Sequence, residues 1–160
     1  MITNILLLIL AYAFMELVAW SNHKYIMHGP LWRWHKDHHV NDLKRPDEAL
    51  QEHKGFEKND LFFLVYAIPA IVLMVAGLAF SISSLVFIAI GISLYGLTYF
   101  VVHDLIYHKR LRVGILQKRN NRYLKAVIKA HRAHHKPKNA ADFESYGLLI
   151  FPKQIGRAHV

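Results

Sequence analysis

The sequence predicts an all-α fold: a polytopic membrane protein of three to four transmembrane helices with a cytoplasmic, histidine-rich helical cap. Its 160 residues suffice for a single domain, residues 1–160. The chain is 54% apolar yet carries a formal net charge of +9, and the apolar and charged residues occupy different segments. Twelve histidines lie in the charged segments, and there is no cysteine. The lack of cysteine excludes disulfides, thiolate-bound metals and cysteine nucleophiles.

The first predicted span covers residues 2–20, an apolar run interrupted only by Thr3, Asn4 and Glu16. Its length suits a helix that crosses the hydrocarbon core. A secretory signal is the alternative, but no basic residue precedes the run and no small-x-small cleavage site follows it. We therefore interpret it as a retained span. Glu16 is either a functional residue within the membrane or an interhelical hydrogen-bonding residue, and we favour the second role.

The next two spans come from residues 61–102, which contain no charged residue across 42 positions. One helix of this length would be about 63 Å long, roughly twice the hydrocarbon thickness. The serine cluster at 81–84 therefore predicts a turn between spans near 61–80 and 84–102. Two adjacent uncharged runs argue against a buried soluble core. A fourth helix, re-entrant or interfacial, stays open among residues 121–150, and the apolar residues 146–151 would suit it.

The positions of the basic residues predict the orientation. Seven Lys and Arg lie between Lys24 and Lys58, thirteen follow Tyr107, and none lies before residue 24 or in the turn at 81–84. With three spans, all of them fall on one side, which the positive-inside rule makes cytoplasmic. We expect an inner-membrane protein whose basic surface faces anionic lipid. No nucleic-acid-binding motif accompanies the charge, so we expect no nucleic-acid partner.

Ten of the twelve histidines form four short motifs, all on this cytoplasmic side. An H-x4-H pair and an H-x2-H-H triple occur early in the chain, and the same order recurs after the last span. The motifs are His23 and His28; His35, His38 and His39; His103 and His108; and His131, His134 and His135. His53 and His159 belong to no motif, and we assign them no role.

Helical geometry indicates why these spacings suit metals. Positions i, i+3 and i+4 of an α-helix lie on one arc of about 100°, so each triple offers three imidazoles on one face. The second triple continues the apolar stripe of Leu124 and Ile128, which predicts that it points inward. The two members of an H-x4-H pair lie about 140° apart on a straight α-helix. A pair therefore suits two different ions, or a helix end such as the one that Gly29 and Pro30 predict after His28.

We conclude that the motifs bind metal, and ten imidazoles fit two ions with five or fewer nitrogens each. Nitrogen ligands alone do not choose among iron, zinc, copper and nickel. Asp104, beside His103, is a candidate to hold a ligand imidazole through its other ring N–H, with a solvated carboxylate as the alternative. Asp37 points away from the histidine face and is expected to be solvated.

The motif set resembles the histidine-rich fatty acid hydroxylase/sterol desaturase superfamily. Within it, the strings HKYIMHGPLWRWHKDHH, HDLIYHKR and LKAVIKAHRAHH are similar to those of bacterial-type β-carotene 3-hydroxylases. FEKNDLFFLVYAIPA at 56–70 and the closing ESYGLLIFP also resemble that group. The resemblance covers most of residues 12–152. The final IGRAHV departs from it. One back-translation of this string into DNA resembles a common sequencing-library adapter, so we expect residues 155–160 to be non-native.

The resemblance implies a membrane non-haem di-iron mono-oxygenase that hydroxylates C3 of β-ionone rings, converting β-carotene to β-cryptoxanthin and then zeaxanthin. It further implies two Fe ions, O2 as co-substrate, and electrons from ferredoxin and NAD(P)H. The partners would be a carotenoid within the bilayer, membrane lipids and the ferredoxin-type donor. The implied metal ligands are His23, His28, His35, His38, His39, His103, His108, His131, His134 and His135, with no catalytic residue beyond the metal centre.

Two other functions stay open at the level of the sequence. One is a fatty acyl or sterol hydroxylase or desaturase on the same scaffold. The other is a non-catalytic membrane metal-binding protein or transporter. A transporter is expected to place ionisable ligands near the bilayer midplane, and residues 61–102 contain neither charge nor histidine. The product formed from β-carotene distinguishes the enzymes from one another.

Overall fold

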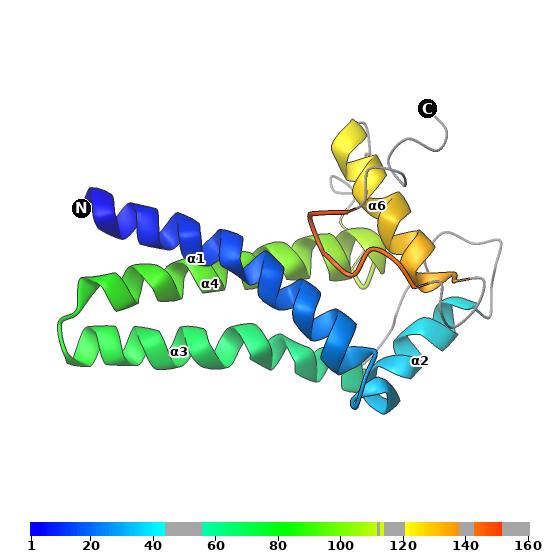
Figure 1. Ribbon diagram of the computed structural model, residues 1–160, viewed down its shortest axis with the longest axis horizontal. Coiled ribbons are helices and arrows are strands. Elements are labelled where there is room, and N and C mark those ends of the chain that lie inside the picture. The colour runs from blue at the N-terminus through cyan, green and yellow to red at the C-terminus, as the bar shows by residue number, and fades with distance from the viewer. Residues whose placement is uncertain (44–55, 112, 114–120, 138–142, 152–160) are drawn as a thin grey trace.

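The computed structural model describes residues 1–43, 56–111, 113, 121–137 and 143–151. Every regular element within these ranges is helical. Three long helices lie side by side, and two shorter helices gather at one end of them (Figure 1). The N-terminus lies at the opposite end, as does the turn between the second and third long helices. The all-α class predicted from the sequence is confirmed. His53 and residues 155–160, including His159, fall outside the described ranges.

The three long helices match the predicted spans. They are α1 (Ile2–Ser21), α3 (Leu64–Ala79) and α4 (Ser83–Tyr99). With their continuations, the segments Ile2–Met27, Lys58–Ala79 and Ser83–Tyr107 are long and apolar enough to cross a membrane. The turn between α3 and α4 contains Ser81 with φ of 56°, within the predicted serine cluster. The fold is therefore a three-span bundle with a helical cap.

Helix α4 is the centre of the bundle because it packs against both α1 and α3. Gly91 permits the contact with α1: a Cβ at this position would collide with the carbonyl oxygen of Leu8. Gly77 does the same between α3 and α4, where a Cβ would lie 2.7 Å from Cγ2 of Val86. Small residues let helix backbones approach closely in a membrane, where packing rather than the hydrophobic effect drives association.

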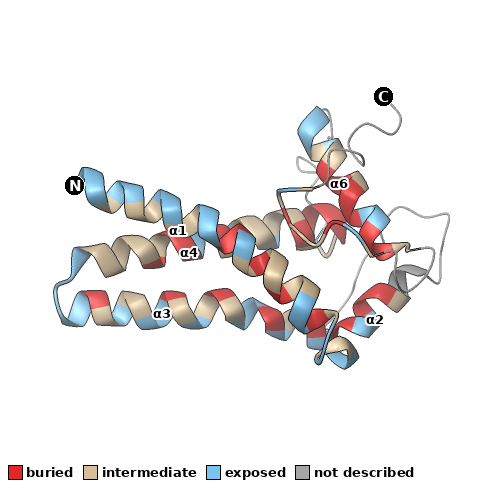
Figure 2. Cartoon of the chain, viewed as in Figure 1, coloured by how far each residue is buried: buried red, intermediate tan, exposed pale blue. Residues whose placement is uncertain are grey.

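The cap consists of α2 (Trp32–Leu43), α6 (Arg122–His135) and three short helical segments. These segments are η1 (Asn22–Met27), η2 (Lys58–Phe63) and η3 (Phe100–Tyr107). The segments η1 and η3 are π-helical, and they continue α1 and α4, respectively. The segment η2 leads into α3. In the cap, α2 contacts η1, η2 and α6, and α6 contacts η3. Figure 2 shows that buried residues concentrate at this end, whereas the far end of the bundle is mostly exposed. The buried part of the molecule is therefore the part that carries the histidines.

Residues 143–151 pass over the junction between the bundle and the cap without forming a helix. The fourth helix left open among residues 121–150 corresponds to α6, in the cap, whereas the apolar residues 146–151, which would have suited a re-entrant or interfacial helix, are not helical. Glu16 holds this segment, because its Oε1 accepts hydrogen bonds from the backbone N–H groups of Leu149 and Ile150, both at 2.9 Å. Its Oε2 accepts a hydrogen bond from the Tyr95 hydroxyl of α4 at 2.5 Å. The interhelical hydrogen-bonding role predicted for Glu16 is confirmed.

Candidate metal centre

The structure brings all ten motif histidines together inside the cap. Nine of them form two groups, in each of which one ring nitrogen per residue lies within 4.8 Å of the others. The first group contains His23, His28, His35, His39 and His134. The second contains His38, His103, His108 and His131. His135 lies between the groups, with its ring centroid 4.3 Å from that of His39 and 4.4 Å from that of His131.

The π-helical segments explain why each H-x4-H pair stays within one group. In η1 the N–H of His28 donates to the carbonyl of His23 at 3.0 Å, and in η3 the N–H of His108 donates to that of His103 at 3.0 Å. Such bonds from i+5 to i define a π-helix, which places residues five apart on the same face. The expectation that each pair serves two different ions is therefore not met by this geometry, because it assumed a straight α-helix. The predicted helix end after His28 is present.

Each H-x2-H-H triple, by contrast, divides between the groups. His35 and His39 belong to the first group and His38 to the second; His131 belongs to the second and His134 to the first. The expectation of one shared face per triple is too coarse, since an arc of about 100° is wide enough to meet two neighbouring sites. The middle histidine of each triple thus belongs to the group built mainly by the other half of the chain: His38 to the second group and His134 to the first. In this correspondence His135 is the counterpart of His39.

The ring nitrogens of the first group are oriented for a cation. Nδ1 of His23 donates to the carbonyl oxygen of Tyr146 at 2.9 Å, and Nδ1 of His35 donates to Oδ1 of Asn59 at 2.6 Å. Their Nε2 atoms, 3.1 Å apart, then both present lone pairs to each other in the neutral state. Two lone pairs at this separation repel, and a metal ion that both face removes the repulsion. The donor set therefore fits a metal.

The nitrogen separations also suit coordination. Nε2 of His35 lies 2.9 Å from Nε2 of His39, and Nε2 of His28 lies 3.1 Å from Nε2 of His134. In the second group, Nε2 of His108 lies 3.1 Å from Nε2 of His131. Adjacent nitrogens bound octahedrally at about 2.1 Å from an ion would be roughly 3.0 Å apart. The nitrogens in each group are thus close enough together to bind one ion.

Electrostatics keeps these imidazoles neutral, as metal ligation requires. Burial, followed by the neighbouring imidazoles, lowers the pKa of His28 to about 4. The same two causes lower the pKa of other cap histidines below their ordinary range: His35, His39, His108, His131 and His134. A buried imidazolium is disfavoured both by the loss of water and by repulsion from a second imidazolium.

The segment before α3 supplies oxygen partners for both groups, and its residues were not among the candidates predicted from the sequence. Asn59 bonds to His35 of the first group, while Oε2 of Glu57 accepts a hydrogen bond from Nδ1 of His38 in the second at 3.1 Å. Oδ2 of Asp60 accepts from the backbone N–H of Glu57 at 3.0 Å, which fixes the start of the segment. The available signal was a run of carboxylate and amide residues beside a span, at the membrane end that carries the histidines.

Asp104 lies beside His103, but its shorter side-chain contact is with Arg110. Its Oδ2 lies 3.6 Å from Nδ1 of His103, beyond hydrogen-bond distance, whereas its Oδ1 lies 3.0 Å from Nε of Arg110. Arg110 also bonds to Oδ1 of Asp60 at 2.5 Å and lies 3.7 Å from Oε2 of Glu57. Arg110 therefore gathers three carboxylates beside the second group, and through Glu57 the network reaches the ring of His38.

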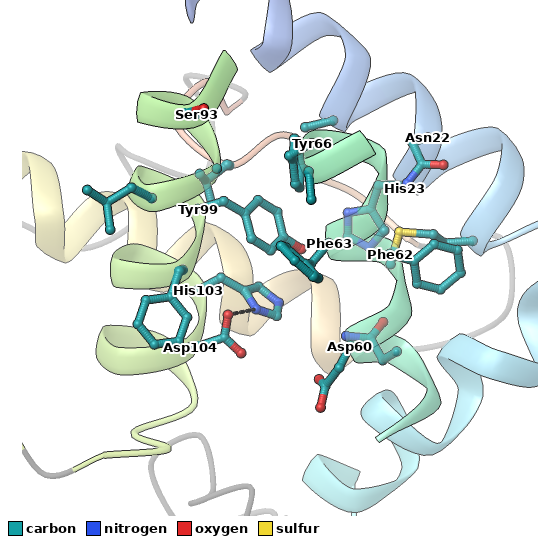
Figure 3. Close-up of a pocket in the computed structure, with 18 of the residues that line it drawn as sticks. Asn22, His23, Asp60, Phe62, Phe63, Tyr66, Ser93, Tyr99, His103 and Asp104 are labelled. Carbon is teal, nitrogen blue, oxygen red and sulfur yellow. Dashed lines mark ion pairs between the residues drawn. The ribbon is translucent and has the colours of Figure 1, made fainter. Parts of the chain in front are cut away.

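A cavity of about 670 Å³ connects this centre with the bundle. Its lining includes His23, His103 and His131 at one end and apolar residues of α3 and α4 at the other. Figure 3 shows Phe63 and Tyr99 between the two helices, with the ring of His103 beside them. The cavity is mostly apolar, so it suits an apolar molecule that approaches the metal groups from the membrane.

Comparison with known proteins agrees with this site. The fatty acid hydroxylase family model matches residues 8–152. A β-carotene hydroxylase from Paracoccus sp. is 39% identical over 151 residues, covering 94% of this chain and 85% of that protein. A β-carotene hydroxylase from Pseudescherichia vulneris is 39% identical over 153 residues, covering 96% and 80%.

A chloroplastic β-carotene hydroxylase of Capsicum annuum is 38% identical over 144 residues, covering 88% of this chain and 41% of the plant protein. No solved structure matches the chain. The family match includes all four histidine motifs, most of the first span and the whole of the other two. This chain therefore belongs to the fatty acid hydroxylase family.

Proposed function

We propose that the protein is a membrane carotenoid hydroxylase that inserts a hydroxyl group at C3 of β-ionone rings, converting β-carotene to β-cryptoxanthin and then zeaxanthin. The observation that carries the proposal is the pair of buried imidazole groups at the end of an apolar cavity open to the membrane spans. The identity to β-carotene hydroxylases over nearly the whole chain supports the choice of substrate.

The ten motif histidines would hold two iron ions. His135 joins the second group as the counterpart of His39, so that each ion has five imidazoles. The bound irons supply oxidation by O2 and two electrons, the chemistry that an unactivated aliphatic C–H requires. Hydrogen bonds would hold four of these rings with Nε2 toward the ions. Asn59 and Glu57 accept them from His35 and His38, and the carbonyls of Tyr146 and Glu144 accept them from His23 and His134. The apolar cavity positions the ring and excludes bulk water from it.

The remaining parts of the proposal concern the surroundings. All of residues 1–160 act as one domain in the bacterial inner membrane, with the cap on the cytoplasmic side. A ferredoxin, itself reduced by NAD(P)H, would deliver electrons there. The basic surface of the cap supports this direction, because opposite charges accelerate the encounter with an acidic donor.

Expression in bacteria that already make β-carotene tests the function. We expect zeaxanthin and some β-cryptoxanthin by chromatography, with proton NMR placing the hydroxyl at C3. A His35→Ala variant present in the membrane at equal amount should leave β-carotene unchanged, because it removes a nitrogen close to two others of the first group. Unchanged β-carotene with the native chain, together with hydroxylated acyl chains in the lipid extract, would instead assign the enzyme to fatty acyl substrates.

A further inference from the structure

We propose that the substrate's extended chain lies in a groove between α3 and α4 that opens sideways to the bilayer and leads to the metal centre. This inference rests on the proposed function, since it concerns how the same site takes a carotenoid. Ser93 and Leu97 line the cavity from α4, and Phe100 and Asp104 line it from η3, which continues that helix. Ser93, Leu97 and Phe100 are spaced by four and three residues, which places them on one helix face.

The lining on α3 follows the same rule. Ala67, Ala70 and Ile71 line the cavity from α3, and Phe63, the last residue of η2, lies four residues before Ala67. The cavity is therefore a groove that follows two adjacent helices rather than a pocket at their ends. From Ser93 to Tyr99, the last residue of α4, it extends over six residues, about 9 Å at 1.5 Å per residue, and it continues along η3 to His103.

The groove faces lipid along one side. Phe63 is 60% exposed, Ile71 61% and Leu97 57%, although each lines the cavity. These residues lie on segments long and apolar enough to span the membrane. Exposed apolar side chains in such segments contact lipid, so a molecule dissolved in the bilayer reaches the groove without passing through water.

Small side chains keep the groove open. Ala67 and Ala70 line it from α3, and Ser93 and Gly96 line it from α4. A Cβ at Gly96 would lie 3.3 Å from Cβ of Tyr66, so the two helices already touch beneath the groove. The remaining space follows the two helices, and it suits an extended apolar chain that carries the reacting ring at its inner end.

The side opening explains how a long molecule is accommodated. The groove does not need to enclose the whole substrate, because the chain leaves it directly into lipid. At the inner end, Phe63 and Tyr99 flank the path toward His103 (Figure 3). The ring is therefore placed beside the metal groups while the polyene lies against α3 and α4. One ring is positioned at a time.

Filling the groove with an aromatic side chain tests the proposal. In Ala67→Phe we expect at least tenfold less zeaxanthin from β-carotene-producing bacteria, with the iron content and melting temperature of the purified protein unchanged. Val72→Phe is the matched control, because Val72 lies on the same helix, is 59% exposed and does not line the cavity. Equal product from Ala67→Phe and the control would overturn the proposal.

Ser93→Phe, with Leu94→Phe as its control, repeats the test from α4 if Ala67→Phe fails to fold. A native chain that makes no zeaxanthin would contradict the proposed function itself. The groove is then judged from β-carotene that remains with the purified protein. Retention by the native chain and Val72→Phe but not by Ala67→Phe supports the groove, and equal retention by all three overturns it.

Discussion

Hydrogen bonds from Nδ1 to fixed oxygens decide which nitrogen each of several cap histidines presents to an ion. His134 shows this, because its Nδ1 donates to the carbonyl of Glu144 at 2.7 Å and leaves Nε2 3.1 Å from that of His28. Such bonds set the tautomer and the orientation of the ring before any ion binds. The centre is thus preorganised by backbone carbonyls and by side chains from η2.

The counterpart relation between His39 and His135 predicts matching effects. We expect His39→Ala and His135→Ala each to lower hydroxylation to about one-tenth or less and to reduce bound iron, because each removes one imidazole from a five-nitrogen group. Iron per chain, measured by mass spectrometry on purified protein, checks this. His53→Ala is the control and should match the native chain. Full iron in His135→Ala alone would exclude it as a ligand.

Arg110 is expected to support the second group through the carboxylates around it. Arg110→Gln leaves the charges of Asp60, Asp104 and Glu57 uncompensated and loosens the hydrogen bond that Glu57 accepts from Nδ1 of His38. We expect iron to be removed by a chelator at about tenfold lower concentration. The chelator concentration that removes iron from Arg110→Lys should fall between those for Arg110→Gln and the native chain, and the exposed Arg33→Gln should behave as native. Unaltered iron retention in Arg110→Gln would show that the network does not support the ligands.

The lowered pKa values predict acid sensitivity. The unfolded chain binds protons on its imidazoles near pH 6.5, whereas folding lowers the pKa of several cap histidines, that of His28 to about 4. Between these values the unfolded state holds more protons, so the free energy of unfolding of the metal-free protein falls as pH decreases. We expect iron loss and inactivity below about pH 6. Undiminished activity at pH 5 would contradict a ten-histidine centre.

At the scale of elements, the helix type determines how a motif is used. In η1 and η3 the change from α- to π-helical hydrogen bonding turns H-x4-H from a divergent pair into a convergent one. In α2 and α6 the regular α-helix does the reverse and spreads each triple over two sites. Each metal group thus draws on a π-helical pair from one half of the chain and on α-helical residues from both halves.

Glu16 joins three elements, which predicts a large effect on stability. Glu16→Leu leaves the Tyr95 hydroxyl and the N–H groups of Leu149 and Ile150 without their acceptor. We expect the free energy of unfolding to fall by about 3 kcal/mol or more, since three donors lose their acceptor and each buried donor left unsatisfied costs about 1 to 3 kcal/mol. Thermal unfolding in detergent measures it. Glu16→Gln, which keeps one oxygen, should lose less, and the lipid-facing Leu17→Val should lose little. A native melting temperature for Glu16→Leu would contradict this role.

At the scale of the whole molecule, the two ends of the bundle differ in exposure, in charge and in histidine content. The far end carries the N-terminus and the α3–α4 turn, and its side chains are mostly exposed and apolar (Figures 1 and 2). The other end carries the buried histidines and the described basic residues. The groove between α3 and α4 leads from the middle of the bundle to the histidine end, so the proposed apolar substrate and water-borne electron donor would approach the same centre from different phases.

This asymmetry predicts how the chain lies in the membrane. Because the sequence has no cysteine, a single introduced thiol reports on one position. In intact bacteria, a membrane-impermeant maleimide should label Phe80→Cys, beside the α3–α4 turn. It should label Arg33→Cys, in the cap, only after the membrane is opened. The reverse pattern would place the cap on the outer side and contradict the cytoplasmic assignment.

The sequence by itself determined the spans, their common charged side and the ten histidines, because these follow from local composition and from spacing along the chain. Only the tertiary structure decided which histidines share a group. That choice depends on π-helical turns and on how α2 crosses α6, and neither is encoded in a spacing. The roles of Glu57, Asn59 and Arg110 were hidden for the same reason: the contacts of Asn59 with His35, of Glu57 with His38 and of Arg110 with Asp60 join residues 19 to 50 apart in sequence. Contacts between distant segments come from packing, which the periodicity of one segment does not contain.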